Sequence, residues 1–166
     1  NSDVEVAPGW LEPLVDALDR DRQVVAVQPK ILAYREKGKF EYAGASGGFI
    51  DYLGFPFCRG RVLDSTEFDT GQYDDEKEVF WATGAALCIR REQYMASGGL
   101  DEVFFAHMEE IDLCWRLKNS GYILKVVPSS VVYHLGGGSL PMNHPRKLFL
   151  NYRNNLLMLH KNLGGA

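Results

Sequence analysis

The sequence has few cysteines, no long apolar run and no excess of positive charge, and each absence excludes a class of protein. Cys58, Cys88 and Cys114 are odd in number, far apart and without zinc-binding spacing, so we expect reduced core thiols in a cytoplasmic setting. No apolar run approaches the roughly 18 residues of a membrane-spanning helix. The 18 lysines and arginines against 22 acidic residues give a net charge of −4, which argues against nucleic acid as a partner.

The remaining composition is that of one globular domain. The chain has 166 residues, of which 46% are hydrophobic, enough for one sizeable core and too few for two. It opens on Asn1-Ser2-Asp3 without an initiator methionine or a signal peptide, and we therefore expect a piece of a longer protein.

Hydrophobic periodicity predicts alternating strands and helices, which is an α/β fold. Apolar positions recur at helical spacing from residue 11 to 18, and a buried strand is expected at 24–27. Pro29 ends its apolar run, and residues 31–34 either lie outside the strand or continue it as an edge segment. A second buried strand is expected at 85–89, and two more on either side of Pro128. Helices are predicted at 90–95, 107–120 and 145–163. The glycine-rich segment 36–76 predicts short strands joined by long loops.

The segment 107–120 is acidic at its start. Glu109, Glu110 and Asp112 stand where a helix dipole favours negative charge, which gives a purely structural interpretation. Asp112 and Arg116 are four residues apart and can form an ion pair. Glu109 and Glu110 are freer, and like-charge crowding favours a carboxyl that can serve as a general base.

Two further places offer metal-ligand chemistry. His134 ends a β-rich run and precedes Gly136-Gly137-Gly138, where it is either a structural histidine or a ligand for a divalent metal. Backbone N–H groups of that glycine run could also bind a phosphate. Asp3 and Glu5 supply carboxylates of the kind that suit Mg²⁺ or Mn²⁺ on a diphosphate, or form a solvated chain end.

Five segments together resemble one protein family. They lie, in order, at residues 1–11, 82–91, 98–105, 109–116 and 134–139. Their order and spacing are similar to the second half of a family 2 glycosyltransferase of the GT-A fold, in its rhamnosyltransferase-like bacterial branch. The resemblance implies a mixed sheet flanked by helices, with the N-terminal nucleotide-binding half missing. Residues 1–144 would form the C-terminal half of the domain and residues 145–166 a helix that packs on it or leads out of it.

The resemblance also implies roles for individual residues. Asp3 falls in the metal-binding DxD position, with Asn1 replacing the first acid, and His134 matches a histidine that completes the metal shell in several members. Glu110 takes the place of the acceptor-activating base, usually an aspartate. The candidate catalytic residues are therefore Glu110, Glu109 and Asp112, and the candidate substrate-binding residues are Trp81, Gly84, Trp115, Arg116 and Asn1.

The implied activity is an inverting transfer that depends on Mg²⁺ or Mn²⁺. A sugar would move from a nucleotide-sugar donor to a hydroxyl of a glycan or lipid-linked acceptor in cell-surface polysaccharide synthesis. Two alternatives remain: a non-catalytic module that binds glycan or a partner protein, and an unrelated metal-dependent hydrolase. Removal of half a sheet would also expose an edge that invites homo-oligomers.

The predicted helix 145–163 combines an apolar stripe with nearby positive charge. One interpretation is packing on the core of the domain. The other is peripheral contact with the inner face of the plasma membrane or docking of a partner, which would suit a lipid-linked acceptor.

Overall fold

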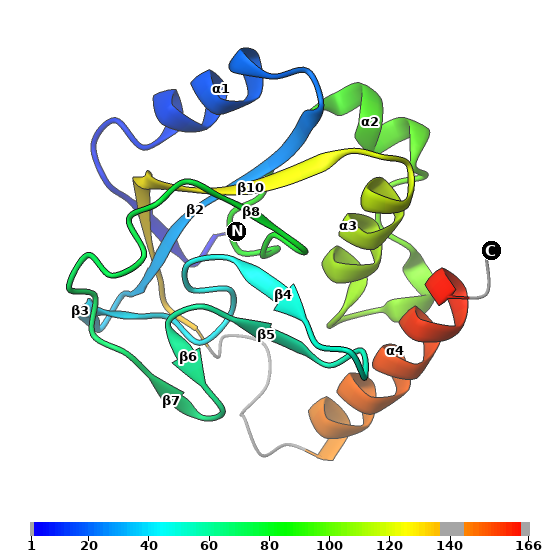
Figure 1. The fold of residues 1–166 in the computed structure, drawn as a ribbon. Coiled ribbons are helices and arrows are strands. Elements are labelled where there is room, and N and C mark those ends of the chain that lie inside the picture. The colour runs from blue at the N-terminus through cyan, green and yellow to red at the C-terminus, as the bar shows by residue number, and fades with distance from the viewer. Residues whose placement is uncertain (1, 137–144, 164–166) are drawn as a thin grey trace.

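The computed structural model describes residues 2–136 and 145–163, and its centre is a mixed sheet with flanking helices, as expected (Figure 1). Among these residues the sheet has six strands, whose main path runs β1-β10-β2-β3, with β8 against β10 and β9 against β2. β10 and β2 are parallel and every other pair is antiparallel. The strands are β1 (Val4–Val6), β2 (Val24–Ala33), β3 (Glu36–Phe40), β8 (Lys77–Val79), β9 (Cys88–Ile89) and β10 (Ile123–His134).

β2 lies at the centre of the sheet and is longer than predicted. Val24, Val25 and Val27 are fully buried because helices and loops cover both faces of the sheet. The strand runs past Pro29 to Ala33, so the continuation is present, but it lies between β10 and β3 inside the sheet and not at an edge. β9 pairs with β2 before Pro29 and β3 pairs with it after Pro29, so no antiparallel neighbour requires the missing N–H.

β10 is likewise one strand where two were predicted. Its register against β2 shifts between Val127 and Val131, and this irregularity accommodates Pro128. The strand bends there by a wide angle (Figure 1). The predicted strand at 85–89 is reduced to β9, because Ala86 turns back to donate a hydrogen bond to the carbonyl of Thr83.

Helices cover the sheet on both sides. α1 (Leu11–Arg20) packs Leu14 and Leu18 onto Val24 and Val127, as its apolar spacing predicts. The larger core lies on the opposite face and includes Ile111, Leu113 and Leu117 of α3 (Glu109–Asn119). α2 (Arg91–Ala96) and the short 3-10 helix η1 (Glu102–Phe104) lie in the segment of chain between β9 and α3.

The glycine-rich segment folds into two hairpins, β4 (Gly48–Ile50) with β5 (Pro56–Cys58) and β6 (Arg61–Val62) with β7 (Ser65–Thr66). Gly48 lies against the Trp81 ring, where a Cβ would come within 2.1 Å of ring carbons. The acidic stretch that follows is held by ion pairs, because buried Lys30 bonds both Asp69 (2.7 Å) and Asp74.

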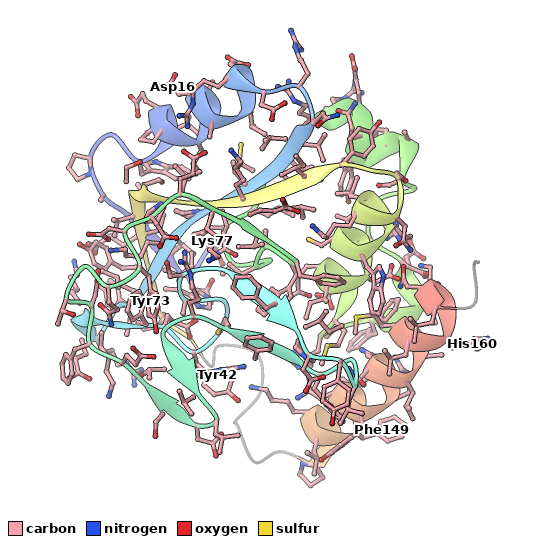
Figure 2. The ribbon with its side chains drawn as sticks, viewed as in Figure 1. Asp16, Tyr42, Tyr73, Lys77, Phe149 and His160 are labelled. Carbon is pink, nitrogen blue, oxygen red and sulfur yellow. The ribbon has the colours of Figure 1, made fainter. Side chains whose placement is uncertain are left out.

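α4 (Pro145–Leu163) packs on α3 and on the β4–β5 hairpin. Asn155 donates to the carbonyl of Gly54 at the hairpin tip (2.9 Å), and Gly54 lies so close to Leu159 that a Cβ would clash. Figure 2 shows Phe149 near the start of this helix and His160 near its end. Within the described part of the chain, no helix has both the length and the apolar character needed to cross a membrane.

Candidate active site

The acidic helix begins two residues later than predicted, after a loop of left-handed backbone. Phe105, His107 and Met108 have φ of 62°, 70° and 73°, a region that L side chains rarely adopt. Met108 stands at the N-cap, and Glu109 and Glu110 form the first turn of α3. The loop thus fixes the direction from which both carboxyls emerge.

The Glu110 carboxyl has the environment of a general base. Its Oε2 is buried without a hydrogen-bond partner among the described residues. Burial raises the pKa of Glu110 to about 7, and the negative charge of Glu109 adds to this, while backbone amides, including that of Gly84, act in the opposite direction. A carboxyl with a pKa near neutrality can exchange a proton at physiological pH.

Gly84 packs on Glu110 and also lines a cavity, whose described lining does not include Glu110 itself. An added Cβ at Gly84 would lie 3.7 Å from the Glu110 Cβ, so the glycine backbone packs directly on this side chain. Gly84 also lines a largely apolar cavity of about 400 Å³, whose lining includes Trp10, Ala85 and Val4. Val4 lines a second cavity of about 320 Å³ together with Asp3.

Asp3 and His134 are brought together by strand pairing. Val4 pairs with His134 in the antiparallel β1–β10 ladder, and the Leu135 N–H donates to the carbonyl of Asp3 (3.0 Å). The Asp3 Oδ2 and the His134 Nε2 are 3.4 Å apart. Residues 131 positions apart in the chain therefore share one site. Glu5, in contrast, forms an ion pair with Lys37.

Glu41 is a part of this site that sequence reasoning missed. Its buried carboxylate lies 3.5 Å from the Nδ1 of His134, on the opposite side of the ring from Asp3. The Glu41 carboxylate, with a further contribution from Asp3, raises the pKa of His134 above its ordinary value. Gly136 packs against the Glu41 carboxylate, where a Cβ would lie 2.7 Å from Oε1.

The Asp3–His134 pair fits a divalent cation. Ligand bonds of about 2.1 Å allow one ion to bind an oxygen and a nitrogen that lie about 3 Å apart. The Glu41 carboxylate lies 3.5 Å from Nδ1 without a hydrogen bond to it, and its charge would favour a proton on Nδ1 and leave the Nε2 lone pair for the ion. Across residues 2–136 and 145–163 no group of three His, Cys, Asp or Glu side chains is arranged to hold a metal, and the Asp3–His134 pair stays a predicted metal site.

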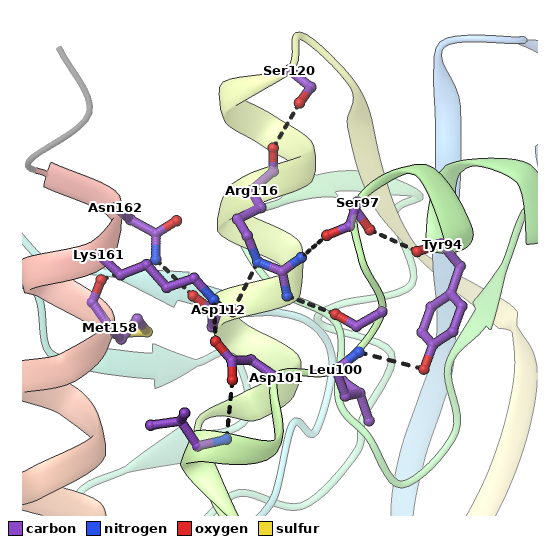
Figure 3. Close-up of polar contacts among 12 residues, drawn as sticks. Tyr94, Ser97, Leu100, Asp101, Asp112, Arg116, Ser120, Met158, Lys161 and Asn162 are labelled. Atoms are coloured by element: carbon purple, nitrogen blue, oxygen red, sulfur yellow. Dashed lines mark hydrogen bonds and ion pairs between the residues drawn. The ribbon is translucent and has the colours of Figure 1, made fainter.

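Asp112 lies in a buried polar network between α3 and α4 (Figure 3). Its carboxylate accepts hydrogen bonds from Arg116, Lys161 and Asn162, each at 2.9 Å. Lys161 also bonds Asp101 at 2.7 Å. The expected pair with Arg116 is present, and the network joins α3 to α4.

The other candidate binding residues are engaged within the protein. The Trp81 indole N–H donates to the carbonyl of Phe49 (2.8 Å), and Trp115 packs edge-on against Phe80 at 5.1 Å. Arg116 also bonds the carbonyls of Ser97 and Gly99. A role for these three in substrate binding stays a prediction. Asn1 and residues 137–139 of the glycine run lie outside the described residues.

The fold is that of a GT-A glycosyltransferase. It superposes on GalNAc-T7, solved with UDP, GalNAc and Mn²⁺, with a TM-score of 0.62 at 20% identity, over 95% of this chain and 30% of that one. A scan against protein-family models finds no match.

Sequence relatives show which glycosyltransferases the chain is similar to. The chain is 32% identical over 141 residues to the N-acetylglucosaminyl-diphospho-decaprenol L-rhamnosyltransferase of Mycobacterium tuberculosis, covering 81% of this chain and 45% of that protein. It is 34% identical to O-antigen biosynthesis protein RfbC of Myxococcus xanthus, over 76% of this chain and 10% of RfbC. It is also 34% identical to rhamnosyltransferase WbbL of Escherichia coli K12, over 43% of this chain and 27% of WbbL.

These relatives confirm the resemblance inferred from the five sequence segments. The chain is a homologue of bacterial glycosyltransferases that include rhamnosyltransferases, and it spans less than half the length of the curated relatives it matches.

Proposed function

We propose that the chain forms the acceptor and metal side of an inverting, metal-dependent family 2 glycosyltransferase. The observation that carries this proposal is the Glu110 carboxyl, buried behind Gly84 with an unpartnered oxygen and a pKa raised to about 7. A structural carboxylate in the same position would be expected to have an ion-pair partner, as Asp112 has.

The proposed reaction is a direct displacement. Glu110 takes the proton of the acceptor hydroxyl while that oxygen bonds to the anomeric carbon of the donor, and the bond to the nucleoside diphosphate breaks on the opposite face. Glu109 contributes its charge, which keeps the Glu110 carboxyl basic. Asp112 does not meet the acceptor and acts by holding α3 against α4.

Asp3 and His134 are proposed to hold Mg²⁺ or Mn²⁺, with Glu41 orienting the imidazole. When bound, the ion supplies positive charge that stabilises the departing diphosphate. The Mn²⁺ of GalNAc-T7 supports divalent metal use on this fold.

The relatives indicate the substrates to test first. The mycobacterial relative is named as an L-rhamnosyltransferase of N-acetylglucosaminyl-diphospho-decaprenol, and RfbC as an O-antigen biosynthesis protein. We therefore propose a nucleotide-sugar donor and a lipid-linked or glycan acceptor, met at the cytoplasmic face of the membrane, in cell-surface polysaccharide synthesis.

The test uses the longest natural form of the protein, with nucleotide-activated rhamnose and N-acetylglucosaminyl-diphospho-prenol as first substrates. E110Q keeps the shape of the side chain and removes the base, so turnover should fall about 10²–10⁴-fold with the fold intact by circular dichroism. D3A should lose turnover as well. If the protein is instead a non-catalytic glycan-binding module, the wild type will show no turnover, and both variants will bind acceptor as the wild type does.

Contact with an anionic lipid surface is proposed for α4. Its exposed stripe comprises Leu148, Phe149, Tyr152, Leu156 and Leu163, next to the exposed hairpin residues Tyr52, Leu53 and Phe55. The helix contains no acidic residue, and Arg146, Lys147 and Arg153 give it positive charge, whereas Lys161 is engaged by Asp101 and Asp112. This combination is typical of helices that lie in a membrane interface.

Vesicle flotation tests this contact without removing the helix, whose inward face includes Met158 and other buried residues. The wild-type protein should float with vesicles containing phosphatidylglycerol and less with pure phosphatidylcholine. F149Q with L156Q should abolish flotation, whereas L100Q, a change at another exposed leucine outside α4, should not. Equal flotation of all three proteins would refute the proposed surface.

A further inference from the structure

The loop before α3 and the first turn of α3 together carry three buried polar atoms that have no hydrogen-bond partner among the described residues. These atoms are His107 Nε2, Glu109 Oε2 and Glu110 Oε2. They emerge within four residues from a backbone whose φ is positive at Phe105, His107 and Met108. Such a conformation persists only where the surrounding structure holds it, and it is typical of functional sites.

One side chain of α4 holds this loop. Asn154 is fully buried, and its Nδ2 faces three carbonyl oxygens of the loop: Phe104 (2.9 Å), Ala106 (2.8 Å) and His107 (2.7 Å). An amide nitrogen has two hydrogens, so the three acceptors share them. The Phe104 carbonyl also accepts from the Ala106 N–H (2.7 Å) and from Arg153 (3.0 Å), so Asn154 matters most for the carbonyls of Ala106 and His107, which the left-handed loop does not place in a helix or a strand.

The residues of the loop do not themselves favour its left-handed backbone. The residues with positive φ are not glycines, so each would relax toward ordinary backbone if the anchor were removed. Arg153 assists from the neighbouring position with hydrogen bonds to the carbonyls of Val103 and Phe104. The contacts of Asn154 reach further along the loop, to the residue two positions before Glu109.

We propose that Asn154 is a positioning residue for Glu110, which it orients through the backbone of residues 104–108. This inference rests on the proposed role of Glu110 as the base. Asn154 touches no reacting atom; it keeps the first turn of α3 aimed so that the Glu110 carboxyl stays shielded from water and meets the acceptor hydroxyl. A displacement of about 1 Å at such a group is enough to cost about 100-fold in rate.

The experiment compares N154A and N154S with N155A in the longest natural form of the protein. Asn155 is the matched control, since it is the next residue of α4, is also buried, and donates to the hairpin carbonyl of Gly54 rather than to the loop. N154A should lower kcat about 10–100-fold with donor KM changed less than about twofold. N154S keeps one donor and should recover part of the rate; it also serves if N154A does not fold.

The pH profile separates positioning from a general loss of stability. The titratable groups around Glu110 are Glu109 and Cys114 on α3 and His107 in the loop. The positive charge of Lys147 on α4 helps to lower the pKa of His107. Because a relaxed loop hydrates Glu110, its pKa should fall toward its ordinary value, and the acid limb of kcat should move to lower pH in N154A and N154S. N155A should leave that midpoint in place.

Amide hydrogen exchange gives a readout that does not need turnover: residues 104–108 should exchange faster in N154A and N154S than in N155A. Unchanged exchange and an unchanged pH midpoint would overturn the positioning role even if E110Q is inactive. If E110Q retains full turnover, the proposed base fails, and faster exchange in N154A then identifies Asn154 as a structural anchor of the loop alone.

Discussion

At the scale of single residues, Glu110 sets the pH dependence of the proposed reaction. An acid whose pKa is raised to about 7 is protonated below that pH and cannot accept a proton. The rate should therefore rise as pH increases through about 7 and level off above it. The folded state binds this proton more tightly than the unfolded chain does, so the same group contributes stability at low pH and loses that contribution as pH rises from 4.5 to about 7.

E109Q tests the cause of this shift. Burial is the largest cause and the charge of Glu109 adds to it, so its removal should move the acid limb of the pH–rate profile to lower pH without abolishing activity. E12Q changes the charge by the same amount on the exposed side of α1 and should leave the profile in place. A midpoint that moves equally in both variants would show that net charge, not the local contact, matters.

E41Q tests the histidine site. Without the carboxylate 3.5 Å from Nδ1, the His134 ring loses its orienting partner, and Mn²⁺ affinity measured by titration calorimetry should fall about 10–100-fold. Glu5 lies two residues from Asp3 but bonds Lys37, so E5Q should bind Mn²⁺ as the wild type does. Equal Mn²⁺ affinities for E41Q and the wild type would show that Glu41 does not orient His134 for metal binding.

The sequence indicates the candidate metal ligands and the candidate base, but not the residues that support them. Asp3, Glu110 and His134 are candidates because their side-chain types suit the chemistry and because they match the motifs of the resembled family, and their roles stay predictions. Glu41 could not, since it lies 93 residues from His134 between two aromatic residues and no spacing links them. Asn154 and Asn162 could have been found: they recur at helical spacing with Leu150 and Met158, which places amides on an apolar face where they need buried partners.

At the scale of elements, the junction of α3 and α4 depends on one buried carboxylate. D112A would leave Arg116 and Lys161 without their counter-charge inside the junction. Both cations keep partial access to water, so we expect the lower end of the cost of breaking a buried pair, about 3 kcal/mol in the free energy of unfolding. Urea unfolding measures this, and D16A on the exposed face of α1 should change stability by less than about 0.5 kcal/mol. A loss of less than about 1 kcal/mol in D112A would show that the network does not hold the junction.

Element boundaries were less predictable than element types. The apolar runs predicted β2 and β10 because both strands are buried on two faces, yet Pro29 and Pro128 were expected to interrupt them. Each proline lies where the sheet already lacks a regular partner, and only the pairing of distant strands creates that place. In the same way, the left-handed loop delayed the start of α3, because contacts from α4 outweigh the local preference of His107 and Met108.

At the scale of the whole molecule, the proposed function places only one side of the reaction on this chain. The proposed base and the proposed metal ligands lie on it, but the described cavity beside Asp3 is lined by Ser2, Val4, Glu5, Tyr34 and Leu135, a set too small to recognise a nucleoside as well. The relatives are more than twice as long as the part that this chain matches. We therefore predict that the 166-residue chain alone shows no detectable transfer, although circular dichroism finds it folded, while a longer natural form turns over the same nucleotide sugar. Measurable turnover by the 166 residues would mean that the donor site is built within them, and that the segments around Asp3 bind the nucleotide without further chain.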